Sequence, residues 1–355
     1  MRLGEALRES RRDVASGAGR TVAFALVYTA LVGGIVLASA LSAAAAVRDA
    51  RAYVASGAAV FVMKATGGID GRSCDAMSML ANVVASGALR EETEGVASAR
   101  LPQTQISLFA ASDGFPDLLR GAGDARGGGL GLSQEVADTL GLEPGDPMAT
   151  TRGTTKVASV FDYPDDGRDP LLAFAAIGQA PHSKAAFDQC WVLIWPHDEK
   201  AVAALGRTVL PGATGSGERP TLVQLNQTRG SQFTAATMFD HSVAGPLAAA
   251  AGGLLGVAFV IRRRLSLASD RHVGVARAAQ VVSQTAQVLL WVAVGAVASL
   301  ALVLVAVRLP VEDRMPIVQQ SAVLLVAGGG AALAASALTV CAIRDSALFR
   351  YFKNR

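Results

Sequence analysis

The fold is decided by the stretch at residues 278–307, AAQVVSQTAQVLLWVAVGAVASLALVLVAV, which holds 30 residues and no Asp, Glu, Lys or Arg. A helix needs about 20 apolar residues to cross the hydrocarbon core of a bilayer. Three further uncharged stretches meet that length, at residues 21–47, 241–261 and 315–343. The sequence therefore predicts a polytopic α-helical membrane protein with four transmembrane helices.

The overall composition favours the same class. Of the 355 residues, 51% are hydrophobic and 17% are charged, whereas a soluble domain carries about 25% charged residues. This composition excludes a purely soluble enzyme and a disordered tail protein. A cleaved signal peptide is the alternative for the first stretch, but signal peptides have apolar regions of only about 7–15 residues. We therefore expect residues 21–47 to be retained as a helix.

Basic residues predict the orientation of these helices. Five arginines lie in residues 1–20 and five more in residues 262–277, and the tail after Ile343 is also basic. Residues 48–240 instead carry 16 basic and 22 acidic side chains, a net charge of −6. Because short cytoplasmic segments are enriched in Lys and Arg, we expect both termini inside and residues 48–240 outside the cell membrane.

The predicted organisation follows from these stretches and from the patterns between them. It comprises a cytoplasmic amphipathic leader (1–20, or simply a solvated charged leader), transmembrane helix 1 (21–47), an extracytoplasmic α+β domain (48–220), a stalk helix (221–240), transmembrane helix 2 (241–261), a cytoplasmic coupling loop (262–284), transmembrane helix 3 (285–307), an outer loop (308–317), transmembrane helix 4 (318–343) and a cytoplasmic tail (344–355).

Within the α+β domain, alternating apolar residues predict strands at 105–110, 155–161 and 190–195. A helix is expected between Ser133, as its N-terminal cap, and Gly141, as its end. Polar helical composition at 221–240, directly before the second apolar stretch, predicts that this stalk continues the transmembrane helix outward.

Two cysteines of this domain are candidates for a disulfide. Cys74 and Cys190 both lie in the segment expected outside, where disulfides form and persist. Two unrelated buried thiols are the alternative, because spacing alone does not determine connectivity. Among the apolar stretches, Gly252 and Gly256 form a G-x-x-x-G pattern, and Gly328 and Gly329 form a second smooth face. Such faces predict close helix packing.

Motifs for catalysis are missing from the sequence. The nearest approach to a phosphate-binding loop, at residues 212–219, has Glu218 where the motif requires Lys. His182, Cys190 and His197 have spacings that match no zinc pattern. We therefore expect no catalytic residue, no metal site and no directly bound cofactor, and we expect the protein not to be an enzyme by itself.

Four patches resemble the FtsX/MacB-like family of ABC transporter permeases, the type VII permeases with one large extracytoplasmic domain. Two of them flank the membrane part: LGEALRESRR at 3–12 is similar to the family's leader, and RDSALFRY at 344–351 is similar to its tail. In the outside domain, GLSQEVADTLGLEPGD at 131–146, together with SVFD at 159–162, is similar to the family's domain core. The fourth, RRRLSLA at 262–268, is similar to the start of the family's coupling loop. Residues 269–274, SDRHVG, depart from the family's pattern.

The resemblance implies a permease subunit that converts ATP hydrolysis on a separate ATPase, which binds ATP and Mg, into movement of its outside domain. That movement would drive export or extraction of a peptide or lipophilic substrate, or mechanotransmission. The residues expected to dock the ATPase are Arg262, Arg263, Arg264, Leu265, Leu267 and Val273. The arginines are equally explained by membrane topology alone.

The partners implied are the ATPase subunits, a second permease chain (identical or paralogous, forming a dimer), membrane lipid, and an extracytoplasmic peptide, lipoprotein or cell-wall partner. Nucleic acid is not expected. Two other functions stay open. One is an ATPase-independent receptor or adaptor whose outside domain binds an extracellular peptide or cell-wall partner, and the other is a structural scaffold.

Overall fold

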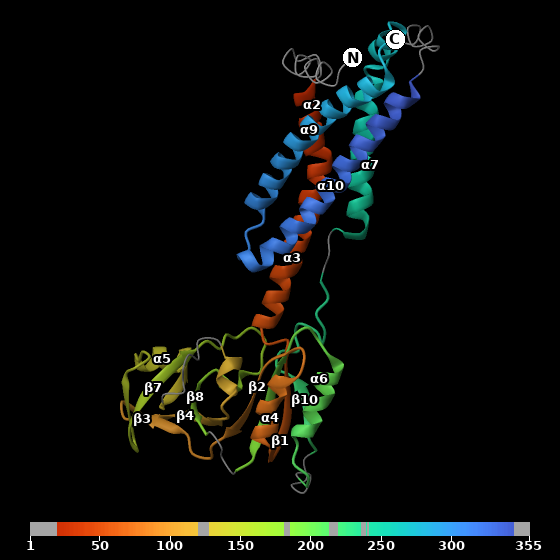
Figure 1. The fold of residues 1–355 in the computed structure, drawn as a ribbon. Coiled ribbons are helices and arrows are strands. Elements are labelled where there is room, and N and C mark those ends of the chain that lie inside the picture. Colours follow the sequence, from red (N-terminus) through yellow and green to blue (C-terminus); the bar gives the residue numbers. More distant parts are fainter. Residues whose placement is uncertain are drawn as a thin grey trace. The chain divides into compact units, whose positions relative to one another are not determined.

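The computed structural model describes residues 20–119, 128–180, 185–212, 219–235, 239 and 241–343 (Figure 1). The chain divides into a helical unit, formed by the described parts of 1–48 and 235–355, and a strand-rich unit, formed by those of 49–234. The predicted leader, apart from Arg20, and the predicted tail lie outside the described residues.

The helical unit contains four apolar helices, all of which, among the described residues, are long enough to cross a membrane by length and composition. They are the first helix, made of α2 (Thr21–Tyr28), a π-helical turn (Thr29–Gly33) and α3 (Gly34–Ala55); α7 (His241–Ile261); α9 (Arg277–Ala306); and α10 (Val311–Ala342). A short helix, α8 (Arg264–His272), lies between α7 and α9.

Three of these helices are longer than the transmembrane helices predicted for them. The first helix extends to Ala55 instead of 47, α9 begins at Arg277 instead of 285, and α10 begins at Val311 instead of 318. Helix formation does not stop where hydrophobicity stops, because Arg, Gln, Glu and Ala are all good helix formers. Hydrophobicity therefore located all four helices and gave the bounds of α7, but the lengths predicted for the other three were too short.

An aromatic cluster ties three of the helices together. Phe24 and Tyr28 from α2 contact Trp291 from α9, with ring centroids 5.8 and 5.7 Å apart, and Phe24 also meets Phe259 from α7 at 5.1 Å. The buried Tyr28 hydroxyl donates a hydrogen bond to the carbonyl of Leu325 in α10, at 3.0 Å. This bond satisfies a polar group that would be costly to bury alone.

The glycines predicted for helix packing lie at the contact between α7 and α10. A Cβ atom on Gly252 would overlap the carbonyl of Gly328, and one on Gly256 would overlap the carbonyl of Ala332. A Cβ on Gly328 would lie 2.8 Å from a methyl group of Val32, in the π-helical turn, and one on Gly329 would lie 2.7 Å from a methyl group of Val292, in α9. Gly252 and Gly256 thus lie against the backbone of α10, and Gly328 and Gly329 lie against side chains of neighbouring helices, as small residues at helix contacts allow.

The strand-rich unit contains ten strands among its described residues, in the order β10-β1-β9-β2-β4-β3-β6-β7-β5-β8. Since β8 also pairs in parallel with β4, strands β4, β3, β6, β7, β5 and β8 close into a ring. The strands are β1 (Val60–Ile69), β2 (Val83–Glu91), β3 (Val96–Ser98), β4 (Leu101–Ala111), β5 (Leu130–Ser133), β6 (Pro147–Thr150), β7 (Gly153–Phe161), β8 (Ala175–Gln179), β9 (Phe187–Ile194) and β10 (Thr221–Gln224).

The three strands predicted in this unit are present as β4, β7 and β9, but the unit is richer in strands than an even α+β mixture. Its helices are short, namely α4 (Gly71–Asp75), α5 (Gln134–Leu140) and α6 (Glu199–Ala204). Helix α5 ends as expected at Gly141, whose φ of 61° suits glycine. Ser133 is the N-cap residue of α5, as expected, but its side chain makes no capping bond; its Oγ instead accepts a hydrogen bond from the Ala175 amide, at 3.2 Å.

The predicted stalk helix at 221–240 is wrong for the residues described. Thr221–Gln224 form strand β10, which pairs antiparallel with β1, and residues 225–235 contain turns and irregular backbone without a helix. Thr221–Gln224 pair their backbone with the edge of β1 that β9 does not occupy, and the β-branched Thr221 and Val223 favour a strand there. The helix that does continue past its apolar stretch is α3.

Candidate functional site

The second arginine of the predicted docking segment, Arg263, contacts other helices of the helical unit. Arg263 Nη1 donates a hydrogen bond to Gln287 Oε1 of α9, at 2.6 Å, and its guanidinium lies 5.2 Å from the centre of the Phe259 ring. A charged hydrogen bond and a cation–π contact hold this side chain in place. Arg263 therefore attaches the start of α8 to α7 and α9.

A second arginine fixes the other end of α8. Arg271 donates hydrogen bonds to Gln280 Oε1 and to the carbonyl of Val340, both at 2.9 Å, and to the carbonyl of Ile343. The last carbonyls of a helix lack partners within the helix and carry partial negative charge. Arg271, in α8, thus caps the C-terminal end of α10. No local sequence pattern predicts this role.

Glutamines on α9 complete this polar contact. Gln280, Gln284 and Gln287 are all buried, and Gln280 also donates to the carbonyl of Leu267, at 2.7 Å. Their spacing of three and four residues places them on one face of α9. Three glutamines at this spacing, opposite a basic segment, were the sequence signal that could have identified this interface.

The six predicted docking residues divide into three groups by burial and contacts. Leu267 is 4% exposed and belongs to the core of the helical unit, and Arg263 is held as described, so neither suits an exposed docking surface. Arg264 and Leu265 are half-buried. Arg262 is exposed, and Val273 is 83% exposed immediately after α8. The segment therefore has one face bound to α9 and α10 and another face presented to solvent.

In the strand-rich unit, three long-range side chains bind the last residue of α3 and the turn that follows it. Arg168 Nη2 donates to the Ala55 carbonyl at 2.9 Å, Asn226 Nδ2 donates to the Ser56 carbonyl at 3.0 Å, and Gln224 Nε2 donates to the Ala58 carbonyl. Asn226 also donates to the carbonyl of Asp166, at 3.1 Å. Carbonyls that a helix end leaves unsatisfied are thereby paired.

Arg168 is itself firmly positioned. Its Nε and Nη2 atoms contact the two carboxylate oxygens of Asp166 at 2.9 and 2.7 Å, and its guanidinium lies 5.0 Å from the Tyr163 ring centre. The hydrogen bonds from Arg168 hold the pKa of Asp166 below its ordinary value. A bidentate pair of this kind fixes direction as well as charge, so the end of α3 is attached to an ordered group.

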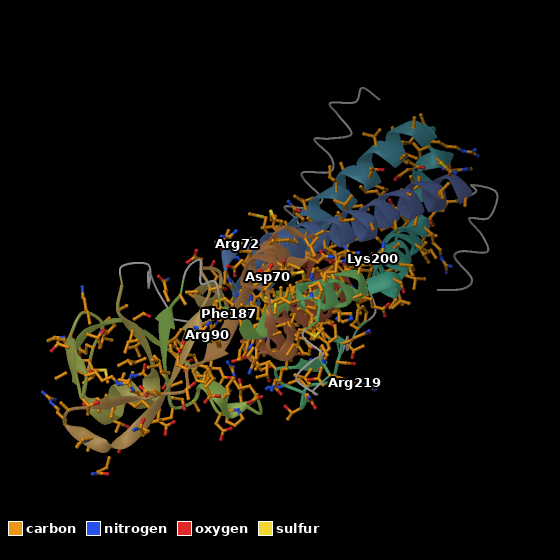
Figure 2. All side chains as sticks on the ribbon, turned by 90° about the horizontal axis from the view of Figure 1, so that it is seen from below. Asp70, Arg72, Arg90, Phe187, Lys200 and Arg219 are labelled. Atoms are coloured by element: carbon orange, nitrogen blue, oxygen red, sulfur yellow. A yellow bond between two sulfur atoms is a disulfide. The ribbon has the colours of Figure 1, made fainter. Side chains whose placement is uncertain are left out.

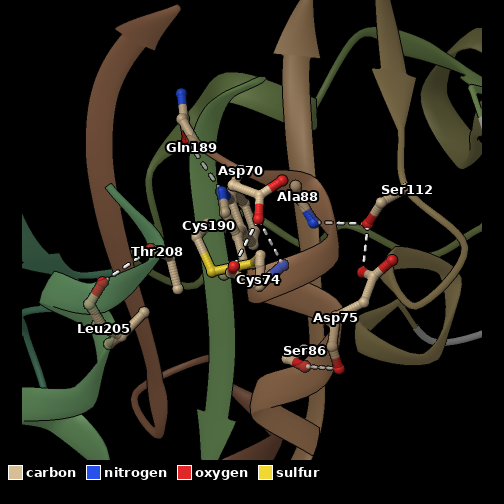
Figure 3. The surroundings of a disulfide bond; sticks show 12 residues. Asp70, Cys74, Asp75, Ser86, Ala88, Ser112, Gln189, Cys190, Leu205 and Thr208 are labelled. Carbon is tan, nitrogen blue, oxygen red and sulfur yellow. Dashed lines mark hydrogen bonds between the residues drawn. A yellow bond between two sulfur atoms is a disulfide. The ribbon is translucent and has the colours of Figure 1, made fainter. Parts of the chain in front are cut away.

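The disulfide predicted between Cys74 and Cys190 is present, and it joins α4 to β9 across a sequence separation of 116 residues (Figure 3). Both cysteines are fully buried. Helix α4 is also held by the Asp70 carboxylate, which accepts hydrogen bonds from the Ser73 amide at 3.1 Å and the Ser73 hydroxyl at 2.5 Å. These hydrogen bonds lower the pKa of Asp70.

Beside α4 lies a cavity of about 620 Å³, whose lining includes Asp70, Arg72, Asp75 and Phe187. Figure 2 labels Asp70, Arg72 and Phe187 in this part of the unit, together with Arg90, whose guanidinium lies 5.6 Å from the Phe187 ring centre. Burial raises the pKa of Asp75. The sequence analysis did not single out any of these cavity residues.

The Asp75 carboxylate has a defined set of partners. The hydroxyl of Ser112 donates to Asp75 Oδ1 at 2.5 Å and accepts from the Ala88 amide at 2.7 Å (Figure 3). Among the described residues, no three His, Cys, Asp or Glu side chains are grouped as a metal site would require. The hydrogen bonds therefore serve to hold α4 against β2 and the end of β4.

Comparison with known proteins gives likenesses to parts of two transporters. No protein-family model and no curated protein matches the sequence. The periplasmic region of MacB from Actinobacillus actinomycetemcomitans is 10% identical with a TM-score of 0.34, over 47% of this chain and 89% of that one. The extracellular domain of YknZ, a noncanonic ABC-type transporter from Gram-positive bacteria, is 12% identical with a TM-score of 0.30, over 47% and 99%. Likenesses at these identities and TM-scores carry no information about function.

Proposed function

We propose that this protein is a membrane-embedded permease subunit of an ABC transporter, which works with a separate ATPase. Helix α8 and both termini lie in the cytoplasm in this proposal, and the strand-rich unit lies outside. The observation that carries it is the two-sided α8 segment: one side is bonded to α9 and α10, and Val273 is 83% exposed beside it. The resemblance of residues 262–268 to a coupling loop supports the same role.

The contacts of α8 suit the transfer of a force. A protein that pushes on the exposed side of α8 would act through Arg263 on α9 and through Arg271 on the end of α10. Charge-assisted hydrogen bonds are directional and about twice as strong as neutral ones. The two arginines therefore make α8 move together with α9 and α10 rather than independently of them.

The route towards the strand-rich unit in this proposal is α3. A helix maintains its length because every interior carbonyl is bonded within it, and α3 continues to Ala55, where Arg168 binds its last carbonyl. Segment 225–235 is not helical and offers no such element. We therefore assign to α3 the role that the sequence suggested for residues 221–240.

The proposed activity is movement of the strand-rich unit, driven by ATP and Mg bound to the partner, for export, extraction or mechanical signalling. A second permease chain, identical or paralogous, would complete the membrane part. Exposed apolar side chains on α9 and α10, such as Val297 and Val326, are available to lipid or to that second chain.

Purification of the tagged full chain from its native host in lipid nanodiscs, with an assay of ATP turnover, tests the proposal. We expect an ATPase subunit to copurify in stoichiometric amount. Replacing the exposed Val273 with Asp should reduce the recovered ATPase by at least about fivefold, since a buried contact of this size is worth about 1 kcal/mol or more.

The matched control is Val311→Asp, which places the same change at another exposed valine, at the start of α10. It lies on the opposite side of the membrane in the proposed topology, so recovery of the ATPase should be unchanged. Recovery of the chain alone, even after cross-linking in membranes, would contradict the proposal and favour the receptor hypothesis.

A further inference from the structure

The strand-rich unit has a second, smaller cavity, of about 200 Å³, at the C-terminal end of α3. Most of the residues that line it are apolar. They come from the end of α3, from β1 and β9, and from residues 117–119, 162–164, 168 and 225. The lining comprises Val54, Ala55, Gly57, Val60, Asp117, Leu118, Leu119, Asp162, Tyr163, Pro164, Arg168, Trp191, Leu193 and Leu225.

This cavity reaches the hydrophobic core. Trp191 is 2% exposed, and Val60 and Leu225 are also buried members of the same core cluster. Protein interiors are packed as densely as organic crystals, and an unfilled apolar cavity destabilises the fold. An apolar group that enters the cavity would restore those contacts.

The acidic side chains around the cavity favour an occupant with positive charge. Asp117 and Asp162 line it and are both exposed. Arg168, the one basic lining residue within the described part of the chain, forms the bidentate pair with Asp166. Residues 48–240 as a whole carry 22 acidic and 16 basic side chains. A field of this sign attracts cations and raises their local concentration.

We propose that this cavity binds an apolar side chain of a basic peptide, with the peptide's positive charges beside Asp117 and Asp162. The apolar side chain would contact Trp191, Leu118 and the last turn of α3. Small-molecule and side-chain sites commonly combine an apolar cavity with a few charged groups at its edge. This inference concerns the strand-rich unit alone and holds whether or not an ATPase partner exists.

The test uses the full chain in nanodiscs of phosphatidylcholine, a lipid without net charge, and calorimetric titration with three capped tripeptides. These are acetyl-Lys-Phe-Lys-amide, acetyl-Glu-Phe-Glu-amide, which reverses the charges, and acetyl-Lys-Gly-Lys-amide, which removes the apolar side chain. We expect the first peptide to bind. The other two should bind at least about tenfold more weakly, because one lacks the positive charges and the other lacks the apolar side chain. Absence of binding by the first, or equal binding of the charge-reversed peptide, would overturn the proposal.

Two pairs of variants locate the binding. Asp162→Asn should weaken the Lys-Phe-Lys peptide about fivefold, the effect of one exposed charge pair, whereas Asp165→Asn removes an exposed neighbour that does not line the cavity. Leu118→Trp should fill the cavity and abolish binding, whereas Leu171→Trp adds the same bulk to the same core elsewhere. Equal effects within either pair would show that the peptide binds at another place. Because Asp162 is exposed, its variant tests the site even if a tryptophan variant does not fold.

Discussion

The chain passes between its two units twice, and the two connections are built differently. The first connection, residues 48–58, contains the end of α3 and three carbonyls that accept hydrogen bonds from distant side chains. The second connection, residues 225–240, lies between β10 and α7 and has no helix among its described residues. The difference follows local sequence: RDARAYVA at 48–55 has only residues that a helix tolerates well, whereas residues 226–240 include Gly230, serine and several threonines.

This difference has a mechanical meaning under the proposed function. A helix transmits displacement along its axis because its interior hydrogen bonds maintain its length, and a segment without regular structure can change its end-to-end distance at small cost. One connection would then transfer movement, and the other would accommodate it.

The largest effect that separates the two connections should come from proline. Ala52→Pro removes the amide that bonds within α3 at an exposed position and should cost at least about 3 kcal/mol. Ala235→Pro places the same residue in the non-helical second connection and should change stability by less than about 0.5 kcal/mol. Thermal unfolding in nanodiscs, with amide exchange of residues 48–58, measures both. Equal losses would show that the two connections do not differ in the way described.

A smaller effect is expected from the side chain that binds the end of α3. Arg168→Ala leaves the Asp166 carboxylate and the Ala55 carbonyl without this partner and should cost about 2 kcal/mol. Arg229→Ala removes an exposed arginine from the second connection and should cost less than about 0.5 kcal/mol. Urea unfolding monitored by tryptophan fluorescence compares them. A neutral Arg168→Ala would mean that the contact to α3 is not stabilising.

The smallest effect comes from a pair of glycines with similar backbone. Gly57, in the first connection, has a φ of 77°, and Gly230, in the second, has a φ of 80°. Alanine at either position should cost about 1 kcal/mol of backbone strain. At Gly57 the added Cβ would also lie 3.0 Å from a Leu225 methyl group, whereas at Gly230 nothing lies within 4 Å. We expect Gly57→Ala to lower the melting temperature further, and identical shifts would argue against tight packing there.

Much of the helical unit was predictable because a bilayer imposes a simple length requirement. Uncharged stretches located all four helices, and the pattern at Gly252 and Gly256 located one packing face. The strand-rich unit was less accessible. Strands β4 and β7 follow from alternation, but the closure of the ring through β4 and β8 pairs segments about 68 residues apart. No local pattern encodes such a pairing.

The docking segment and the disulfide were less predictable, because their roles depend on contacts between residues far apart in the sequence. The basic segment at 262–264 was identified from charge, yet charge does not distinguish Arg263, which binds Gln287, from the exposed Arg262. Likewise Leu267 was expected to dock a partner but is buried in the core. The pairing of Cys74 with Cys190 was one of two possibilities from sequence, and the structure selects it.

The hydrogen bonds of Asn226 have a consequence for how this protein can be produced. Asn226, Gln227 and Thr228 match the acceptor pattern for N-linked glycans, which are attached to the same side-chain nitrogen that donates to Ser56 and Asp166. The side chain is fully buried in the folded chain, so a sugar could be added only before folding and would then occupy the place of the end of α3. Expression in a host that glycosylates secreted proteins should therefore yield a misfolded fraction that carries a glycan at Asn226. Asn226→Gln and Thr228→Val each abolish the acceptor pattern, but the first moves the amide that makes both bonds, and the second removes the hydroxyl that donates to Asn226 Oδ1, at 2.6 Å. Each variant should therefore lose the glycan and also some stability.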